Sequence, residues 1–159
     1  MTRHQISFAA DAQLSAQEQA IVTEARQILL RHLNQNPVLS SWQALLDYCA
    51  VSVRGEVERL HALYLDRKNR LICDEQLAVG TVDHVPVYPR EVLKRAILLG
   101  ASALILVHNH PAGDPEPSEA DLKMTKEIQK ACAALGITLH DHIITGAGRE
   151  TSLRARGAI

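Results

Sequence analysis

The stretch ASALILVHNHPAGDPEPSEAD, residues 101–121, carries the strongest fold signal in the chain. Its run of apolar residues, 103–107, is continuous, as expected of a central strand that is covered on both faces. Residues 111–117 are rich in proline and glycine and indicate a stiff loop. Ser118 then begins a helix that extends to about Leu135. The stretch therefore predicts a strand, a loop and a helix in direct succession.

Two histidines stand at the end of this predicted strand. His108 and His110 are separated by one residue, so in extended backbone both imidazoles project to the same side and can reach one ion. In open α/β sheets, ligands bind at the carboxyl ends of the strands. Asp121, in the first turn of the following helix, can supply an oxygen ligand. These three residues predict a Zn²⁺ site with one coordination position open for water, which is typical of catalytic sites.

Other interpretations of these residues are open at this point. A His-x-His pair alone is equally well explained as polar residues in a solvated loop. Ser118 and Asp121 also fit a helix N-cap, in which side-chain oxygens accept hydrogen bonds from backbone N–H groups. The zinc interpretation therefore depends on the occurrence of all these residues in one strand–loop–helix unit.

The sequence on either side predicts further strands and helices. Residues 57–65 and 71–79 form the two strands of a hairpin around a polar turn. Pro89 begins a helix that Gly100 can end. Residues 137–145 form a last core strand. The apolar face of the helix after Pro89 is expected to consist of Val92, Leu93, Ala96, Ile97 and Leu99. The inward side chains of the helix after Ser118 are expected to be Leu122, Thr125, Ile128, Cys132 and Leu135.

The N-terminal third of the chain has a helical pattern. Ser15 and Glu18 form a capping box that begins one helix, and a second helix begins near Ser40. We expect residues 1–50 to form a helical segment and residues 51–159 to form the main domain. Alternating strands and helices predict an α/β fold, with a mixed sheet covered by helices.

Bulk properties limit the function classes. The 159 residues carry a formal net charge of −1, which gives no general attraction to nucleic acid or to anionic membranes. The longest apolar stretch has about 12 residues, whereas a membrane-spanning helix needs about 18 or more. The N-terminus lacks the features of a signal peptide, and three scattered cysteines predict no disulfide framework. These features favour a cytoplasmic protein without membrane association.

The polar stretch resembles the His-x-His-Pro…Ser-x-x-Asp motif of the JAMM/MPN+ metalloproteases, and specifically their bacterial RadC-like branch. The resemblance extends from about Ser41 to the C-terminus. It includes LYLDRKNRLI at 63–72, YPREV at 88–92 and LHDHIITG at 139–146. It implies the α/β layering of that family, which is similar to that of cytidine deaminases.

The resemblance also implies an activity and its residues. It implies a zinc metallopeptidase-like hydrolase that cleaves a peptide or isopeptide bond in a protein or peptide substrate. It places the general base at Glu58; Glu56 shares the same strand face, but at most one of the two can reach the site. Ser118 would donate a hydrogen bond to the developing oxyanion.

Three neighbouring residues receive supporting roles from the resemblance. His140 and His142 repeat the His-x-His spacing in the last predicted strand. The resemblance makes them framework residues or residues that contact the ligands. Asp141 is expected to be a hydrogen-bond partner of a site imidazole.

Three rival functions are considered. A nucleobase deaminase requires a C-x-x-C pair, and the sequence contains none. A RadC-type role in DNA repair or nucleic-acid processing gains little support from the near-neutral charge and the few aromatic residues. A metal-bearing binding module without turnover would be favoured by an exposed Glu58 that lies far from the metal ligands.

Overall fold

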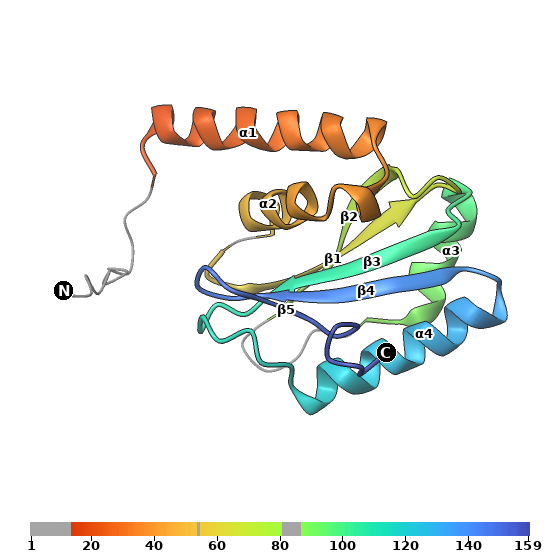
Figure 1. Ribbon diagram of the computed structural model, residues 1–159. Helices are drawn as coiled ribbons and strands as arrows, with labels where there is room; N and C mark the ends of the chain where they lie inside the picture. Colours follow the sequence, from red (N-terminus) through yellow and green to blue (C-terminus); the bar gives the residue numbers. More distant parts are fainter. Residues whose placement is uncertain (1–13, 54, 81–86) are drawn as a thin grey trace.

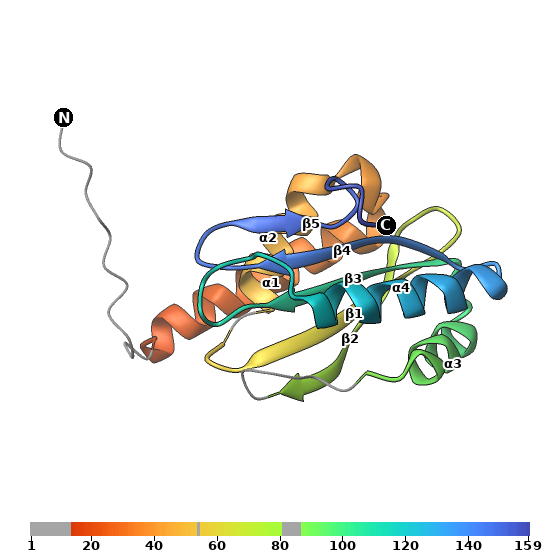
Figure 2. The same ribbon diagram turned by 90° about the horizontal axis from the view of Figure 1, so that it is seen from below.

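Five strands form one mixed sheet, with helices on both faces, in the part of the chain that the computed structural model describes: residues 14–53, 55–80 and 87–159 (Figure 1, Figure 2). In chain order the elements are α1 (Ala16–Gln35), the 3₁₀ turn η1 (Val38–Ser40), α2 (Trp42–Ser52), β1 (Glu58–Leu65), β2 (Leu71–Gly80), α3 (Pro89–Leu99), β3 (Ala103–Asn109), α4 (Glu119–Ala134), β4 (Thr138–Thr145) and β5 (Glu150–Ser152).

The strand order is β2-β1-β3-β4-β5. Strand β3 pairs with β4 in parallel, and the other neighbouring strands pair antiparallel. The connection from β3 to β4 passes through α4, as parallel strands require a crossover. The prediction of an α/β fold with a mixed sheet covered by helices is confirmed.

The sheet separates two apolar layers. Helices α1 and α2 cover one face, and α3 and α4 cover the other (Figure 1, Figure 2). Strand β1 contributes alternate residues to each layer: Leu63 and Leu65 pack toward α1 and α2, whereas Ala62 and Tyr64 pack toward α3 and α4. Burying one such leucine side chain contributes about 2 kcal/mol to the free energy of unfolding. Glu58, an even-numbered residue of β1, therefore faces the α3/α4 layer.

Local sequence signals mark the helix ends as predicted. The side chain of Ser15 accepts from the backbone N–H of Glu18, and Glu18 accepts in return from the backbone of Ser15. Pro89 is the first residue of α3. Gly100 follows α3 with φ of 64°, a left-handed conformation that glycine adopts without steric cost.

One strand was not predicted, and two predictions about the core need correction. Residues 137–145 contain β4, the last strand with core residues, and the short β5 follows it at the sheet edge. Ile97 is 60% exposed, since it lies at the flank of α3 rather than on the face formed by Val92, Leu93 and Ala96. Leu135 is 53% exposed because it is the C-cap residue of α4, where the helical periodicity has ended.

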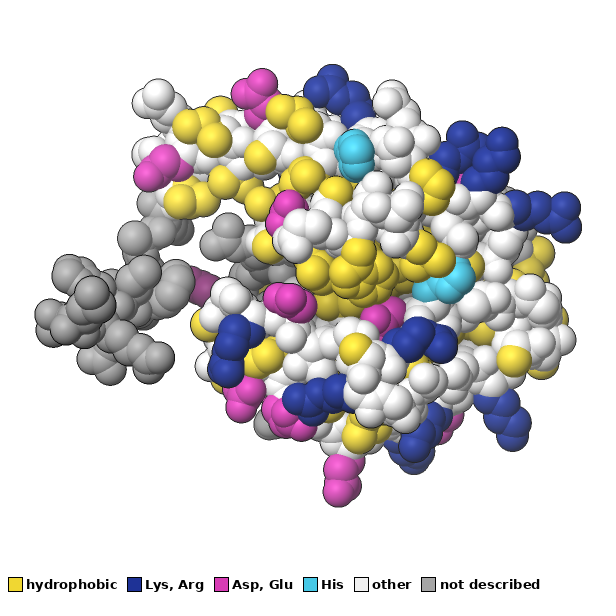
Figure 3. Space-filling model, viewed as in Figure 1, with side chains coloured by type: hydrophobic (Ala, Val, Ile, Leu, Met, Phe, Trp, Pro, Cys, Tyr) yellow, Lys and Arg dark blue, Asp and Glu magenta, His cyan; other side chains and the backbone are white. Residues whose placement is uncertain are grey.

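The N-terminal helices share a core with the sheet. Helix α2 runs through residue 50, and its Leu45, Tyr48 and Cys49 are buried against β1 and β3. The domain boundary at residue 50 stays a prediction. Apolar side chains gather below the α1/α2 layer (Figure 3). Leu39 and Trp42 line a cavity of about 480 Å³ together with residues of β4, β5 and the turn after β5. None of the described helices is long and apolar enough to span a membrane.

Candidate metal centre

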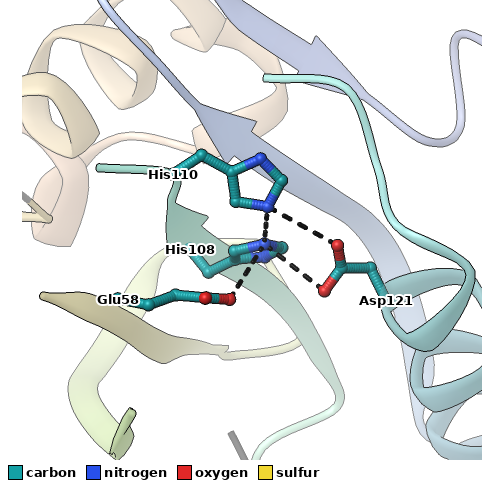
Figure 4. Close-up of side chains that lie close together, drawn as sticks. All are labelled: Glu58, His108, His110 and Asp121. Atoms are coloured by element: carbon teal, nitrogen blue, oxygen red, sulfur yellow. Dashed lines mark hydrogen bonds and ion pairs between the residues drawn. The ribbon is translucent and has the colours of Figure 1, made fainter. Parts of the chain in front are cut away.

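Four side chains from three elements converge at one end of the sheet. Glu58 is at the start of β1, His108 and His110 are at the end of β3, and Asp121 is in the first turn of α4 (Figure 4). One nitrogen or oxygen atom of each lies within 4.8 Å of all the others. The three residues predicted as metal ligands and the predicted base therefore lie together; we call them the metal cluster.

The distances within the metal cluster centre on His108. Its Nε2 lies 2.8 Å from Nε2 of His110, 3.5 Å from Oδ1 of Asp121 and 3.7 Å from Oε1 of Glu58. Nε2 of His110 lies 3.5 Å from Oδ2 of Asp121. Two ring nitrogens at 2.8 Å cannot both present lone pairs to each other, so one of them carries a proton and donates it to the other.

Strand pairing places Glu58 beside the histidines. Leu60 of β1 pairs with His108 of β3, and β1 continues past this pair to Glu58. Between the two histidines, the side chain of Asn109 bonds to the backbone around Glu58. Its Oδ1 accepts from the backbone N–H of Arg59 at 2.9 Å, and its Nδ2 donates to the carbonyl of Val57 at 3.1 Å. The backbone on both sides of Glu58 is thus fixed to the end of β3.

The loop after β3 holds the second histidine. The backbone N–H of His110 donates to the carbonyl of Thr145 at 2.8 Å, and Nδ1 of His110 lies 2.8 Å from the carbonyl oxygen of Asp114. A carbonyl only accepts, so Nδ1 carries a proton and Nε2 is the atom that turns toward the cluster. Gly113 of this loop lies against Gly146, which follows β4. A Cβ atom on Gly146 would lie 2.3 Å from the carbonyl oxygen of Gly113, so position 146 requires glycine.

Burial and charge set the protonation of the metal cluster. His108 is 1% exposed, and burial lowers its pKa to about 4, so its ring is neutral. The Asp121 carboxylate beside His110 raises the pKa of that ring. Burial raises the pKa of Asp121, but the contact with His110 and the hydrogen bonds from Ser118 outweigh it and hold the pKa well below its usual range. An ionised carboxylate and a neutral buried imidazole are the forms that bind metal.

The donor set fits a zinc ion. Two imidazole nitrogens and a carboxylate oxygen are ligand types that zinc accepts, and a second carboxylate stands beside them. In the metal-free protein a proton on one of the two Nε2 atoms forms the hydrogen bond between His108 and His110, and metal binding to such sites releases protons.

Comparison with known families matches residues 39–158 to the RadC-like JAB domain. The chain belongs to this family. A UPF0758 protein of Rhodobacter capsulatus is 61% identical over 145 residues, which cover 90% of this chain and 68% of that protein. A UPF0758 protein of Ruegeria pomeroyi is 53% identical over 154 residues, which cover 92% and 69%. The predicted resemblance to the RadC-like branch of the JAMM/MPN+ proteins is confirmed.

Ser118 is the N-cap of α4 in the JAB domain. Its hydroxyl donates to Oδ2 of Asp121 at 2.7 Å, and its backbone N–H donates to the same oxygen at 2.8 Å. The backbone N–H of Asp121 donates back to Oγ of Ser118 at 3.1 Å. The N-cap interpretation is therefore confirmed, and the same contacts orient the Asp121 carboxylate. The oxyanion role of Ser118 stays a prediction.

Only one of the two candidate glutamates lies in the metal cluster. The Glu58 side chain is 15% exposed and contacts His108, whereas Glu56 is exposed to solvent. This is the position on β1 that the resemblance gave for the general base.

The contacts behind the ligands agree with the expectation for His142 and differ from it for Asp141. Asp141 does not contact a site imidazole; its carboxylate accepts from the backbone N–H groups of His142 and Arg154 and from the Ser152 hydroxyl. The partner of His108 is His142, whose Nε2 lies 2.7 Å from Nδ1 of His108. His140, which was also expected to support the site, contacts Asn69 instead: its Nε2 lies 2.7 Å from Oδ1 of Asn69.

Thr125 is a further residue of the site that the sequence indicated only as a core residue. Its Oγ1 lies 2.6 Å from Nδ1 of His142 and donates to the carbonyl oxygen of Asp121 at 2.6 Å. Burial holds the pKa of His142 well below its usual value. The spacing of four residues from Asp121 to Thr125 was the signal available in the sequence, because such residues lie on one helix face.

Proposed function

We propose that this JAB domain is a zinc-dependent hydrolase that cleaves a peptide or isopeptide bond in a protein or peptide substrate. The observation that carries the proposal is the metal cluster: Nε2 of His108 and of His110 and a carboxylate oxygen of Asp121 converge, with the Glu58 carboxylate adjoining them. Family membership supports the proposal, since JAMM/MPN+ metalloproteases share this motif.

His108, His110 and Asp121 would hold the zinc ion. His108 is in β3, His110 is the first residue after β3, and Asp121 is in α4. When bound, zinc would supply a Lewis acid that polarises a carbonyl group and lowers the pKa of water from 15.7 to about 7. Three protein ligands leave a tetrahedral ion one position for water or substrate, as in catalytic zinc sites.

Glu58 would act as the general base. Its carboxylate would take a proton from the water that attacks the substrate carbonyl carbon and return it to the leaving amine nitrogen. Its Oε1 is 3.7 Å from Nε2 of His108, close enough for one water molecule at the cluster to contact both Glu58 and the metal position. This location supports an enzyme over a binding module without turnover.

Ser118 would stabilise the developing oxyanion. To do so its hydroxyl must turn its proton from Asp121 toward substrate. Oδ2 of Asp121 would then keep the backbone N–H of Ser118 as its donor. One such hydrogen bond to an oxyanion is commonly worth about 3 kcal/mol in the transition state.

A pair of matched variants tests the proposal. Glu58→Gln keeps the size of the side chain and removes the base, so the protein should bind about one zinc per chain and lose cleavage. Glu56→Gln, two residues away and exposed, should keep both properties. The measurements are zinc content by elemental analysis and cleavage of a peptide library by mass spectrometry.

The outcomes separate the candidate functions. Zinc-loaded wild type that cleaves no peptide or isopeptide bond would favour the binding module. Full cleavage by Glu58→Gln would remove Glu58 from the mechanism. A wild-type protein that binds no zinc would contradict the proposal as a whole.

A further inference from the structure

We propose that His142 and Thr125 are positioning residues that fix the proton on Nδ1 of His108 and so turn the lone pair of its Nε2 toward the metal cluster. The proposal deepens the proposed zinc site and rests on it. It concerns neutral rings and the tautomer that each adopts.

Three hydrogen bonds connect His108 to the helix that carries Asp121. Nδ1 of His108 lies 2.7 Å from Nε2 of His142, and Nδ1 of His142 lies 2.6 Å from Oγ1 of Thr125. Oγ1 of Thr125 lies 2.6 Å from the carbonyl oxygen of Asp121. This chain of hydrogen bonds begins at one proposed zinc ligand, passes through His142 of β4 and ends at the backbone of another proposed ligand.

The chemistry of the last group decides the direction of every proton in the chain. A carbonyl oxygen only accepts, so the single hydroxyl proton of Thr125 points to Asp121. Oγ1 must then accept from Nδ1–H of His142. A neutral imidazole has one N–H, so Nε2 of His142 is an acceptor and Nδ1 of His108 is the donor to it. Nε2 of His108 is left with a lone pair.

Burial keeps this arrangement unique. His142 and Thr125 are both 0% exposed, and His108 is 1% exposed. Water therefore cannot supply an alternative donor or acceptor for the ring nitrogens. If Thr125 lost its hydroxyl, Nδ1–H of His142 would have no acceptor, and an unmatched buried polar group is destabilising. The proton would move to Nε2 of His142, which forces Nδ1 of His108 to accept and puts a proton on its Nε2.

The tautomer of His108 can be read without zinc. Two-bond ¹H–¹⁵N correlations on the metal-free wild type should show the protonated nitrogen of His108 and of His142 to be Nδ1 in both rings. Protonation of either ring at Nε2 instead, in the wild type, would overturn the proposal. This measurement needs no variant and no activity.

Zinc affinity tests the consequence. Thr125→Val should lower the affinity for Zn²⁺ by 10-fold to 100-fold, the range typical for residues that orient a metal ligand. Thr125→Ser restores a hydroxyl and should recover the wild-type affinity. Thr151→Val, at another buried threonine outside the chain of hydrogen bonds, is the matched control and should leave zinc binding unchanged. Competition with a chromophoric chelator gives the affinities.

The proposal and the function it rests on fail in different ways. If the wild type binds zinc but His108 carries its proton on Nε2 in the metal-free protein, the positioning chain is wrong while the zinc site stands. An unchanged affinity in a folded Thr125→Val protein also overturns it. If the wild type binds no zinc but His108 and His142 both show Nδ1–H, the positioning chain of hydrogen bonds is supported and the proposed function fails.

Discussion

Two buried polar clusters lie on opposite faces of β1, and their hydrogen-bonding chemistry differs. The metal cluster, on the α3/α4 face, contains two carboxylates and two imidazoles that turn Nε2 toward one point. The second, which we call the Asp74 cluster, lies on the α1/α2 face and consists of Arg26, Tyr48, His61 and Asp74. In the Asp74 cluster, donor groups from the surrounding elements contact both oxygens of the Asp74 carboxylate.

The contacts of Asp74 show how a buried charge is satisfied within the protein. The Tyr48 hydroxyl donates to Oδ2 at 2.5 Å, Nδ1 of His61 is 2.7 Å from Oδ1, and the Arg26 guanidinium is 3.8 Å from Oδ2. Asp121 in the metal cluster has donors from Ser118 on Oδ2, while its Oδ1 faces Nε2 of His108. Acceptors that converge in this way need a cation, whereas the Asp74 cluster already contains its own positive partners.

The largest difference is expected for one histidine from each cluster. His108→Ala should abolish stoichiometric zinc binding, because it removes the most buried ligand. His61→Ala, an equally drastic change on the other face of the sheet, should keep about one zinc per chain. Elemental analysis of the purified proteins gives the metal content, with circular dichroism as the check on folding.

The opposite pattern would break the distinction between the clusters. Zinc retained by folded His108→Ala, together with zinc lost from folded His61→Ala, would place the metal at the Asp74 cluster on the α1/α2 face. His61 would then be the ligand, bound through its Nε2, which is a buried atom without a hydrogen-bond partner in the described part of the chain.

A smaller effect is expected on stability, and it depends on pH. Burial raises the pKa of Asp74, but hydrogen bonds from His61 and Tyr48 outweigh burial and lower it below its usual value. A depressed pKa means that the carboxylate stabilises the folded chain above the unfolded-state pKa of about 3.9, and that this contribution is lost as pH falls through the folded-state pKa. The titratable or charged groups around Asp74 are His61 of β1, Tyr48 and Cys49 of α2, and Arg26 of α1.

Asp74→Asn tests this contribution. The variant should lose about 3 kcal/mol of unfolding free energy near pH 7, because His61, Tyr48 and Arg26 lose a buried anionic partner. The difference from wild type should shrink as pH falls below about 4. Urea titrations between pH 3 and pH 7 measure the difference. Glu75→Gln, on the same strand in a half-exposed ion pair with Arg95 of α3, is the control and should have little effect. A constant difference at all pH values would show that the charge of Asp74 is not the cause.

Local patterns were sufficient to predict the strand–loop–helix unit and, as candidates, the three residues of the metal cluster within it: His108, His110 and Asp121. The apolar run at 103–107, the capping residues at Ser118 and Asp121, and the spacing of His108 and His110 each depend only on neighbours in sequence. Glu58 is distant in sequence, and its place was given by the family resemblance. The pairing of Leu60 with His108 then accounts for its position.

The wrong assignment of Asp141 as a partner of a site imidazole has a physical cause in strand register. Strands β3 and β4 pair in parallel with an irregularity after Leu104, so that Leu104 pairs with Leu139 but Ile105 pairs with Asp141. This extra residue in β4 places His142, rather than Asp141, beside Leu106 on the α4 face. A one-residue shift exchanges the faces of all following side chains, and no local sequence pattern predicted it. A similar irregularity in the pairing of β1 with β2 precedes His61, and the Asp74 cluster was not predicted at all.

The smallest stability effect is expected at Ser118, where capping and catalysis are combined. Ser118→Ala should cost about 1 kcal/mol of unfolding free energy, the usual value for a lost N-cap. Ser118→Thr keeps a hydroxyl and should keep most of that stability. If the hydroxyl also donates to the oxyanion, turnover by zinc-loaded Ser118→Ala should fall by about 100-fold, and Ser118→Thr should retain more activity. Ser118→Asp is the less useful variant here, because it would place a second carboxylate against Oδ2 of Asp121, where the serine hydroxyl now donates. Equal turnover in Ser118→Ala and wild type, measured per zinc-loaded molecule, would leave Ser118 as a cap that only orients Asp121.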